Sequence, residues 1–132
     1  MAILDLSTLL ENLQPVLDPD EYVFCTVNGD LTHYLSLKPL ATFVEEEGLT
    51  LILTKPQAQS LGVCADPTFK RITLSVYSSL EAVGLTAVVA SALAKEGISA
   101  NVIAAYHHDH VFVPIKQANH AMQVLINLNN FK

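Results

Sequence analysis

The sequence predicts an α+β fold of the ferredoxin-like type, in which helices form a sandwich with antiparallel sheet. Of the 132 residues, 51% are hydrophobic and 15% are charged, so the chain has enough apolar surface to form a packed core. Residues 71–128 alternate strand and helix patterns in the order β-α-β-β-α. The first half of the chain contains further strand patterns that are available to complete the sheet.

The elements of the second half follow from periodicity and turn signals. They are a strand over 71–77, a turn over 78–84, a helix from Leu85, strands over 98–106 and 111–115 joined at 107–110, and a helix over 118–128. Gly97 stands where a helix C-terminus is expected. This order is most of a ferredoxin-like unit, but too little chain follows Leu128 for a closing strand. We therefore expect the closing strand to come from elsewhere.

The first half is less regular. Its predicted elements are a helix near 6–13, a strand over 22–27, a loosely alternating stretch over 31–37, a hairpin of 41–44 and 49–54, a helix over 55–61 and a connector over 62–67. Thr8 and Glu11 fit a capping box for the first helix, although Asp5 or Ser7 could cap it instead. Pro15, Asp18, Pro19 and Asp20 are predicted to break the chain before the first strand.

Both halves pair an extended hairpin with helices. The preferred architecture is therefore a fused pair, residues 1–66 and 67–132, related by a pseudo-two-fold axis and sharing one sheet or packing their sheets together. A meander joined to a βαβ unit, without internal symmetry, is the alternative.

Charge is unevenly distributed along the chain. Residues 1–66 contain ten acidic and two basic side chains, whereas residues 67–132 contain three acidic and five basic ones. Lys70 and Arg71 do not form the basic stripe that nucleic-acid binding needs, so no nucleic-acid partner is expected. The asymmetry could draw the halves, or two copies, together, or it could reflect solvated acidic faces.

Several patterns indicate a cytoplasmic location. Asp5 interrupts the start of the chain where a signal peptide would be apolar, and the run from Leu85 to Ala94 is too short to cross a membrane. Cys25 and Cys64 are isolated, which favours reduced thiols that pack as small core side chains. No membrane association is expected.

One segment suggests a family. The sequence ITLSVYSSLEAVGLTAVVASALAKEGIS (72–99) consists of a strand, a turn that ends in Gly-Leu, an apolar helix and a Gly-Ile-Ser strand start, and AYHHDHVFVP (105–114) follows as a hairpin. Over about 70–127 the chain resembles an ACT domain, of the tandem type found in amino-acid sensors and aspartate-kinase regulatory regions. The resemblance implies an ACT sandwich made of two ACT-like halves, the first of them divergent. It also implies an amino acid or a related metabolite bound between ACT units.

The resemblance places the ligand at the turn before the second-half helix. The site residues that it implies are Ser78, Ser79, Glu81, Val83, Gly84, Leu85, Thr86 and Asp109. Gly84 at a helix N-terminus suits a ligand carboxylate, or it simply permits close packing of the turn. Glu81 could bind an amino group or favour the helix as an acidic first-turn residue, and the hydroxyls could be ligand donors or ordinary caps. Glu81 is displaced from the usual acidic position, and Val83 stands where many ACT domains have proline.

Other chemistry has weaker support. His107, His108, Asp109 and His110 are the one local group with metal-ligand chemistry, but consecutive residues near a turn diverge, so neither a metal nor a cofactor is expected and the histidines should be exposed. The chain has no G-x-S-x-G, Walker, dinucleotide or H-E-x-x-H motif, so no catalytic residue and no enzyme activity are expected.

The sequence therefore predicts a small-molecule-binding regulatory or sensor protein, with an amino acid as the ligand. The alternative is a non-catalytic protein-interaction module whose ligand loop has decayed. Because exposed sheet edges tend to pair, we expect a homodimer, although the first half could cover the edge instead.

Overall fold

The structure, a computed structural model, describes residues 5–63, 65–76 and 78–128. The first half contains α1 (Leu6–Asn12), β1 (Pro15–Val27), the 3₁₀ helix η1 (Leu31–Leu37), β2 (Ala41–Glu45), β3 (Gly48–Thr54) and α2 (Lys55–Leu61). The second half contains β4 (Phe69–Leu74), α3 (Leu85–Lys95), β5 (Asn101–Ala104), β6 (Asp109–Pro114), the 3₁₀ helix η2 (Ile115–Gln117) and α4 (Ala118–Asn127). The expectations for Cys64 and Tyr77 concern residues outside these ranges.

The chain forms two compact units. The split unit consists of Met1–Pro19 together with Lys70–Lys132, and the continuous unit is Asp20–Phe69. These units differ from the predicted halves because Leu9, Leu10 and Leu13 are buried in the core of the split unit. The two ACT-like halves, residues 1–66 and 67–132, were defined by sequence patterns, whereas the two units are defined by packing. The division into these halves stays a prediction.

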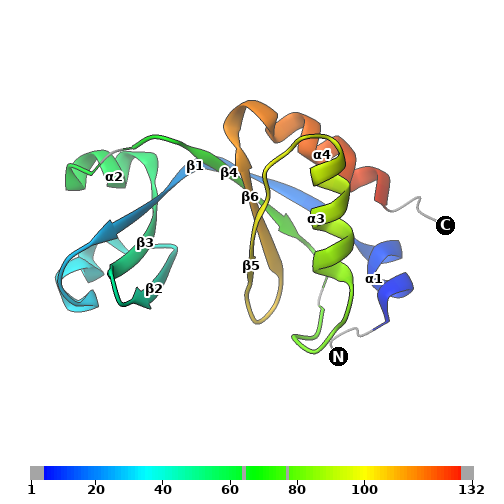
Figure 1. Cartoon of the computed structure of the whole chain (residues 1–132), viewed down its shortest axis with the longest axis horizontal. Coiled ribbons are helices and arrows are strands. Elements are labelled where there is room, and N and C mark those ends of the chain that lie inside the picture. Colours follow the sequence, from blue (N-terminus) through cyan, green and yellow to red (C-terminus); the bar gives the residue numbers. More distant parts are fainter. Residues whose placement is uncertain (1–4, 64, 77, 129–132) are drawn as a thin grey trace. The chain divides into compact units, whose positions relative to one another are not determined.

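The split unit has the predicted ferredoxin-like order. Hydrogen bonds link its strands in the order β1-β4-β6-β5, and α3 connects β4 to β5. Helices α1, α3 and α4 lie together on one side of these strands (Figure 1), where their apolar side chains and those of β4 and β6 form one core. The closing position beside β4 is taken by the beginning of β1. The predicted missing strand is thus supplied by the first half of the chain.

The beginning of β1 corrects the sequence analysis, which placed a break at residues 15–20. Pro15 and Pro19 are an even number of residues apart, so their missing N–H groups fall on the same edge of the strand. The pairing of β1 with β3 begins only at Tyr22, so this edge is not needed for that ladder. The Asp18 carboxylate accepts hydrogen bonds from Nε and Nη2 of Arg71 at 3.1 and 2.6 Å. Both side chains are mostly buried, and their pairing stabilises the strand.

The continuous unit is an antiparallel sheet in the order β2-β3-β1. Its register runs from Tyr22 opposite Thr54 to Val27 opposite Leu49. Alternate residues of β3 face α2 and η1 in a second core that contains Leu49, Leu51, Leu53, Val23 and Ala58. Cys25 packs against this core as predicted, and burial raises the pKa of its thiol.

Side-chain caps decide two local outcomes in the first half. The Asp5 carboxylate accepts the Thr8 N–H at 3.0 Å, so Asp5 is the residue that caps α1. The Asp30 carboxylate likewise accepts the Thr32 N–H at 3.1 Å and begins η1. The loosely alternating stretch over 31–37 is therefore a 3₁₀ helix rather than a strand, because the cap satisfies its first N–H group locally.

Candidate functional site

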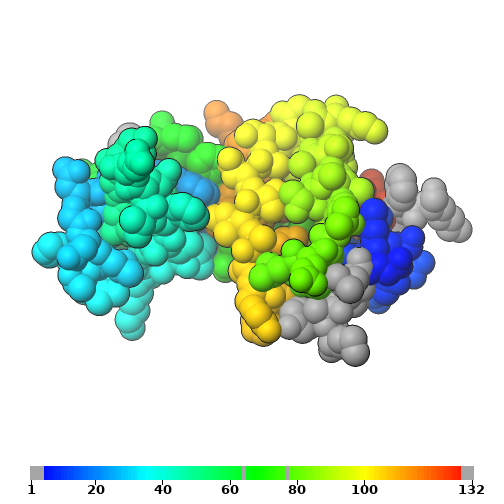
Figure 2. Space-filling model, turned by 60° about the horizontal axis from the view of Figure 1, so that its bottom comes forward, coloured from blue at the N-terminus to red at the C-terminus, as the bar shows by residue number. Residues whose placement is uncertain are grey.

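The turn that precedes α3 closes a small cavity within the split unit. The cavity has a volume of about 130 Å³ and is lined by Ser78, Ser79, Leu80, Ala82, Gly84, Leu85, Thr86, Ala104 and Asp109. Figure 2 shows the loop over 78–84, in green, next to the gold turn between β5 and β6. Six of the eight predicted site residues therefore line one hollow, between the start of α3 and the end of a hairpin.

Helix α3 begins without a side-chain cap. Gly84 is its N-cap residue, and no side chain accepts a hydrogen bond from the first turn. The Ser79 Oγ instead accepts the N–H of Glu81 at 3.1 Å, and the Ser79 carbonyl accepts that of Ala82 at 3.0 Å, so this serine orders the preceding turn. The first N–H groups of a helix have no intrahelical acceptor and carry partial positive charge. Their place in the cavity wall suits an anionic ligand group.

Gly84 is required by the local backbone. Its φ of 104° lies in the region that side chains rarely adopt, and a Cβ added there would stand 3.0 Å from Cδ2 of Leu6. The close-packing interpretation of Gly84 is therefore correct. The ligand interpretation is compatible with it, because Gly84 also lines the cavity.

Substituting Gly84 by alanine is expected to lower the free energy of unfolding by about 1–2 kcal/mol, because the strained φ adds to the contact with Leu6. Urea unfolding monitored by circular dichroism measures the change. Substituting Gly62 by alanine is the matched control: its φ is also positive, but the added Cβ would meet nothing within 4 Å. If the two variants lose equal stability, the contact with Leu6 contributes nothing.

Asp109 is an acidic residue at a core-facing position. It lies two residues before Val111 and four before Val113, and all three side chains lie on the same face of β6. The two valines are fully buried in the core of the split unit, and Asp109 is 8% exposed. Burial raises the pKa of Asp109, and the nearby His108 partly offsets the increase. No buried side-chain oxygen or nitrogen of the described residues lacks a hydrogen-bond partner, so this carboxylate is not an unpaired buried group.

Two predicted site residues lie outside the cavity lining. Glu81 is exposed and lies within the turn ordered by Ser79, and Val83, which follows this turn, is 82% exposed. Conversely, Ala104 lines the cavity although it was not among the predicted site residues. Ala104 is the cross-strand partner of Asp109, so knowledge of the hairpin register would have placed both on one face.

The histidines beside Asp109 do not converge. His107 is exposed, while His108 and His110 are only partly exposed, which corrects the expectation that all three are exposed. His110 Nδ1 is 3.0 Å from Thr73 Oγ1, and His108 Nδ1 is 3.3 Å from the Val76 carbonyl oxygen. Burial, followed by the charges of Arg71 and His108, lowers the pKa of His110. In the part of the chain that the structure describes, no group of three or more His, Cys, Asp or Glu side chains could hold a metal ion.

A second hollow lies on the outer side of α3. Its volume is about 310 Å³, and Ala87, Val88, Ser91, Ala92, Lys95 and Leu128 line it. It is more open than the first, and Lys95 is its one charged side chain among these residues. It lacks the convergent polar groups of a specific metabolite site.

Among the residues that the structure describes, none of the helices has both the length and the apolar composition that a membrane span requires.

Comparison with solved structures identifies related folds. A Vibrio cholerae protein of unknown function, described as a possible transport protein, is 53% identical with a TM-score of 0.87 over 94% of this chain and 95% of its own. The regulatory subunit of aspartate kinase from Thermus flavus is 12% identical, with a TM-score of 0.64 over 86% of this chain and 95% of its own. An Agobacterium tumefaciens protein is 11% identical, with a TM-score of 0.65 over 89% of each chain. No curated protein matches the chain.

The sequence also matches a known domain family twice. One ACT-domain match covers residues 1–70, and a second covers residues 70–127. The predicted resemblance is confirmed, and it extends to the divergent first half. ACT domains are regulatory modules, and the solved structures named above share the fold of this chain. The chain therefore belongs to the ACT-domain family and contains two ACT domains in tandem.

Proposed function

We propose that this protein is a cytoplasmic regulator or sensor that binds an amino acid or a related small metabolite and catalyses no reaction itself. The observation that carries the proposal is the cavity between the uncapped start of α3 and the buried carboxylate of Asp109. A polar hollow with one buried carboxylate and several N–H and hydroxyl groups is suited to hold a small charged molecule. The regulatory aspartate-kinase subunits with the same fold support a sensing role.

Several polar groups of the cavity lining have a proposed part in binding. The N–H groups at the start of α3, beside Leu85 and Thr86, hold a ligand carboxylate. The hydroxyls of Ser78 and Thr86 add hydrogen bonds, and Asp109 contacts a positive group. Glu81 and Val83 remain predictions at the edge of the site, where a ligand or a second copy could reach them.

Titration calorimetry of the full chain with each of the twenty amino acids tests this function. We expect heat of binding for at least one of them, together with a higher unfolding temperature in its presence. The Gly84→Ala variant should bind more weakly, because the contact with Leu6 shifts the turn that forms the cavity wall. Properly folded protein that responds to none of the twenty would refute amino-acid sensing.

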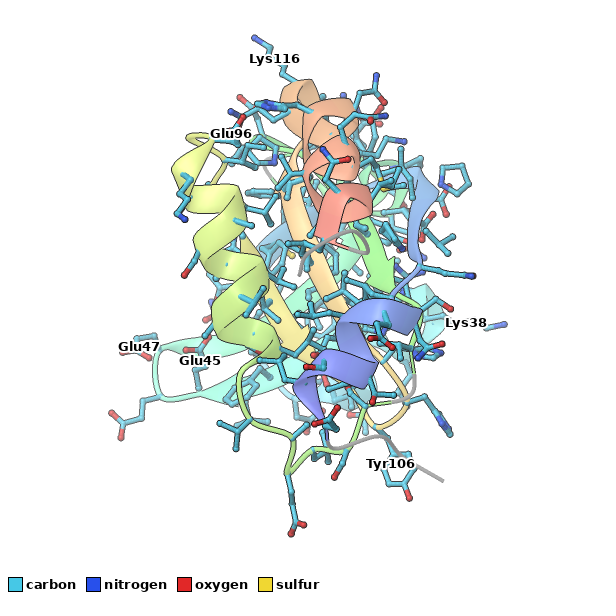
Figure 3. The ribbon with its side chains drawn as sticks, turned by 90° about the vertical axis from the view of Figure 1, so that its right-hand side faces the viewer. Lys38, Glu45, Glu47, Glu96, Tyr106 and Lys116 are labelled. Atoms are coloured by element: carbon cyan, nitrogen blue, oxygen red, sulfur yellow. The ribbon has the colours of Figure 1, made fainter. Side chains whose placement is uncertain are left out.

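A non-catalytic interaction module is the second candidate. Leu80, Val83 and Tyr106 are exposed by 65%, 82% and 68%, although they are large and apolar. Figure 3 shows Tyr106 projecting from the β5–β6 turn, at the opposite end of the split unit from Glu96, the C-cap of α3. Sedimentation analysis of a Val83→Asp, Tyr106→Asp double variant tests whether a dimer forms through these side chains, because such a dimer would dissociate. The calorimetry described above separates the candidates, since a sensor binds an amino acid and an interaction module does not.

A further inference from the structure

Strand β2 forms one end of the sheet in the continuous unit. Within the described residues it pairs with β3 alone, so its other side presents a row of backbone N–H and C=O groups. Every residue of β2 after Ala41 is exposed. This open side and the loop that follows it, residues 41–47, are called the β2 edge below. An edge of this kind can accept one further strand.

Two large apolar side chains of the β2 edge are exposed. Phe43 is 70% exposed and Val44 is 82% exposed. Because successive side chains of a strand point to opposite faces of the sheet, one of them lies on each face. A strand added at this edge would therefore find an apolar contact on both of its faces, as well as backbone hydrogen-bonding groups along its length.

Acidic side chains determine what kind of strand fits. Glu45, Glu46 and Glu47 are all exposed, and none of them forms an ion pair with another described residue. The Thr50 hydroxyl donates a hydrogen bond to the Glu45 carboxylate. Thr50 is the cross-strand partner of Phe43, so this bond holds the carboxylate on the face of the sheet that carries Phe43. An incoming strand with a basic side chain next to an apolar one matches this arrangement.

The charge of the whole unit argues against a second copy of this chain as the partner. The continuous unit has seven acidic and two basic side chains, so two such units brought together at their β2 edges would repel each other. Figure 3 shows Lys38, one of the two basic residues, on the opposite side of the view from Glu45 and Glu47. The glutamates therefore stay available to a basic partner, which the same charge attracts.

We propose that the β2 edge binds an extended, basic segment of another protein as an additional strand. Backbone hydrogen bonds to β2 hold the segment, and its apolar side chains contact Phe43 and Val44. Its lysine or arginine side chains pair with the glutamates at 45–47. This surface belongs to the continuous unit, whereas the cavity is formed by residues of the split unit, so either proposal can fail without the other.

Fluorescence anisotropy of labelled peptides with the full chain tests the proposal. The peptide KKVTVTVKK has a strand-forming centre and basic ends. EEVTVTVEE has the same centre with acidic ends, and KKVTPTVKK has the same charge but a central proline that opposes strand pairing. At low ionic strength we expect KKVTVTVKK to bind about tenfold more tightly than either control, because it alone combines strand pairing with several surface ion pairs. Equal affinity of either control peptide would overturn the proposal.

A pair of variants links binding to the β2 edge. Glu46→Lys combined with Glu47→Lys should lower the affinity for KKVTVTVKK about tenfold. Glu11→Lys combined with Glu96→Lys makes the same change of charge at exposed positions of the split unit and should leave the affinity nearly unchanged. Hydrogen exchange of the β2 amides should slow when the peptide binds. Unchanged exchange would mean contact through charge alone and would contradict strand addition.

Sedimentation analysis of the chain without peptide examines a second copy as the occupant. Phe43 is largely exposed, so Phe43→Asp leaves the core of the unit intact. A dimer that this substitution dissociates would show that a second copy covers the β2 edge, and this result would also overturn the proposal. We expect the same state of association with and without the substitution.

Discussion

Substituting Leu9 by alanine is expected to destabilise the protein by about 2–5 kcal/mol, the cost of removing a leucine side chain from a closed core. Leu9 is fully buried, and it packs in the core of the split unit with side chains of α3, α4 and β6. The loss should appear in urea unfolding of the full chain. Because the core around Leu9 is built mostly by residues 70–128, the N-terminal helix is an integral part of the C-terminal fold.

The control for this variant is Leu35→Ala in η1. Leu35 is 56% exposed, so the same substitution removes little buried surface and should cost less than about 0.5 kcal/mol. Equal losses at Leu9 and Leu35 would show that α1 does not contribute to the core in solution.

Substituting Asp109 by asparagine is expected to stabilise the unliganded protein by about 0.5–2 kcal/mol at neutral pH, at the expense of ligand affinity. The Asp109 side chain is 8% exposed, and burial raises the pKa of its carboxyl group above that of the unfolded chain. Between the pKa of Asp109 in the unfolded chain and its higher pKa in the folded protein, the folded protein therefore keeps a proton on this carboxyl group that the unfolded chain has lost. Stability then falls as the pH rises through the folded-state pKa of Asp109.

The pH profile identifies the origin of this effect. The asparagine variant has no such proton, so its advantage should be full above the folded-state pKa of Asp109 and should disappear below about pH 4, where both states are protonated. Thermal unfolding of both proteins across this range gives the profile, and Glu11→Gln serves as the exposed-site control. An advantage that does not change with pH would mean that packing, not charge, separates the two proteins.

The regular half of the fold could be predicted because its signals are local. The apolar stripe from Leu85 to Leu93 specifies one face of α3, and this helix formed as expected. A strand was predicted over 111–115, and β6 formed over Asp109–Pro114, so Asp109 belongs to the strand and not to the preceding turn. The beginning of β1 could not be predicted, because Pro15 and Pro19 usually end a strand. They are tolerated here only because β3 pairs with β1 from Tyr22 onward. This pairing joins residues far apart in the sequence, so local patterns do not reveal it. Similarly, the cap on η1 is one hydrogen bond from Asp30, which a loose alternation does not reveal.

The candidate site was predicted in part, because some of its signals are local and others depend on the path of the chain. Gly84 marks a strand-to-helix turn in any sequence, so the loop around it could be located. Which loop side chains line the cavity depends on the path of the turn, and the Ser79 hydrogen bonds set that path. Glu81 and Val83 were therefore grouped with residues that the turn separates from them. The burial of Asp109 was not predicted, because this residue was expected in the turn over 107–110. Its spacing of two residues to Val111 is the signal that could have placed it on the core-facing side of the strand.

The division of β1 between two compact units has a consequence for synthesis on the ribosome. The continuous unit, Asp20–Phe69, emerges as one stretch and has its own core, so it can fold while translation continues. The amphipathic helix that precedes it emerges earlier, yet its partners follow only after Phe69, and the Asp18–Arg71 contact spans 53 residues. The apolar side chains of Leu9, Leu10 and Leu13 therefore stay exposed until the residues after Phe69 have been synthesised. We expect chaperones to bind α1 before the rest of the split unit has been synthesised.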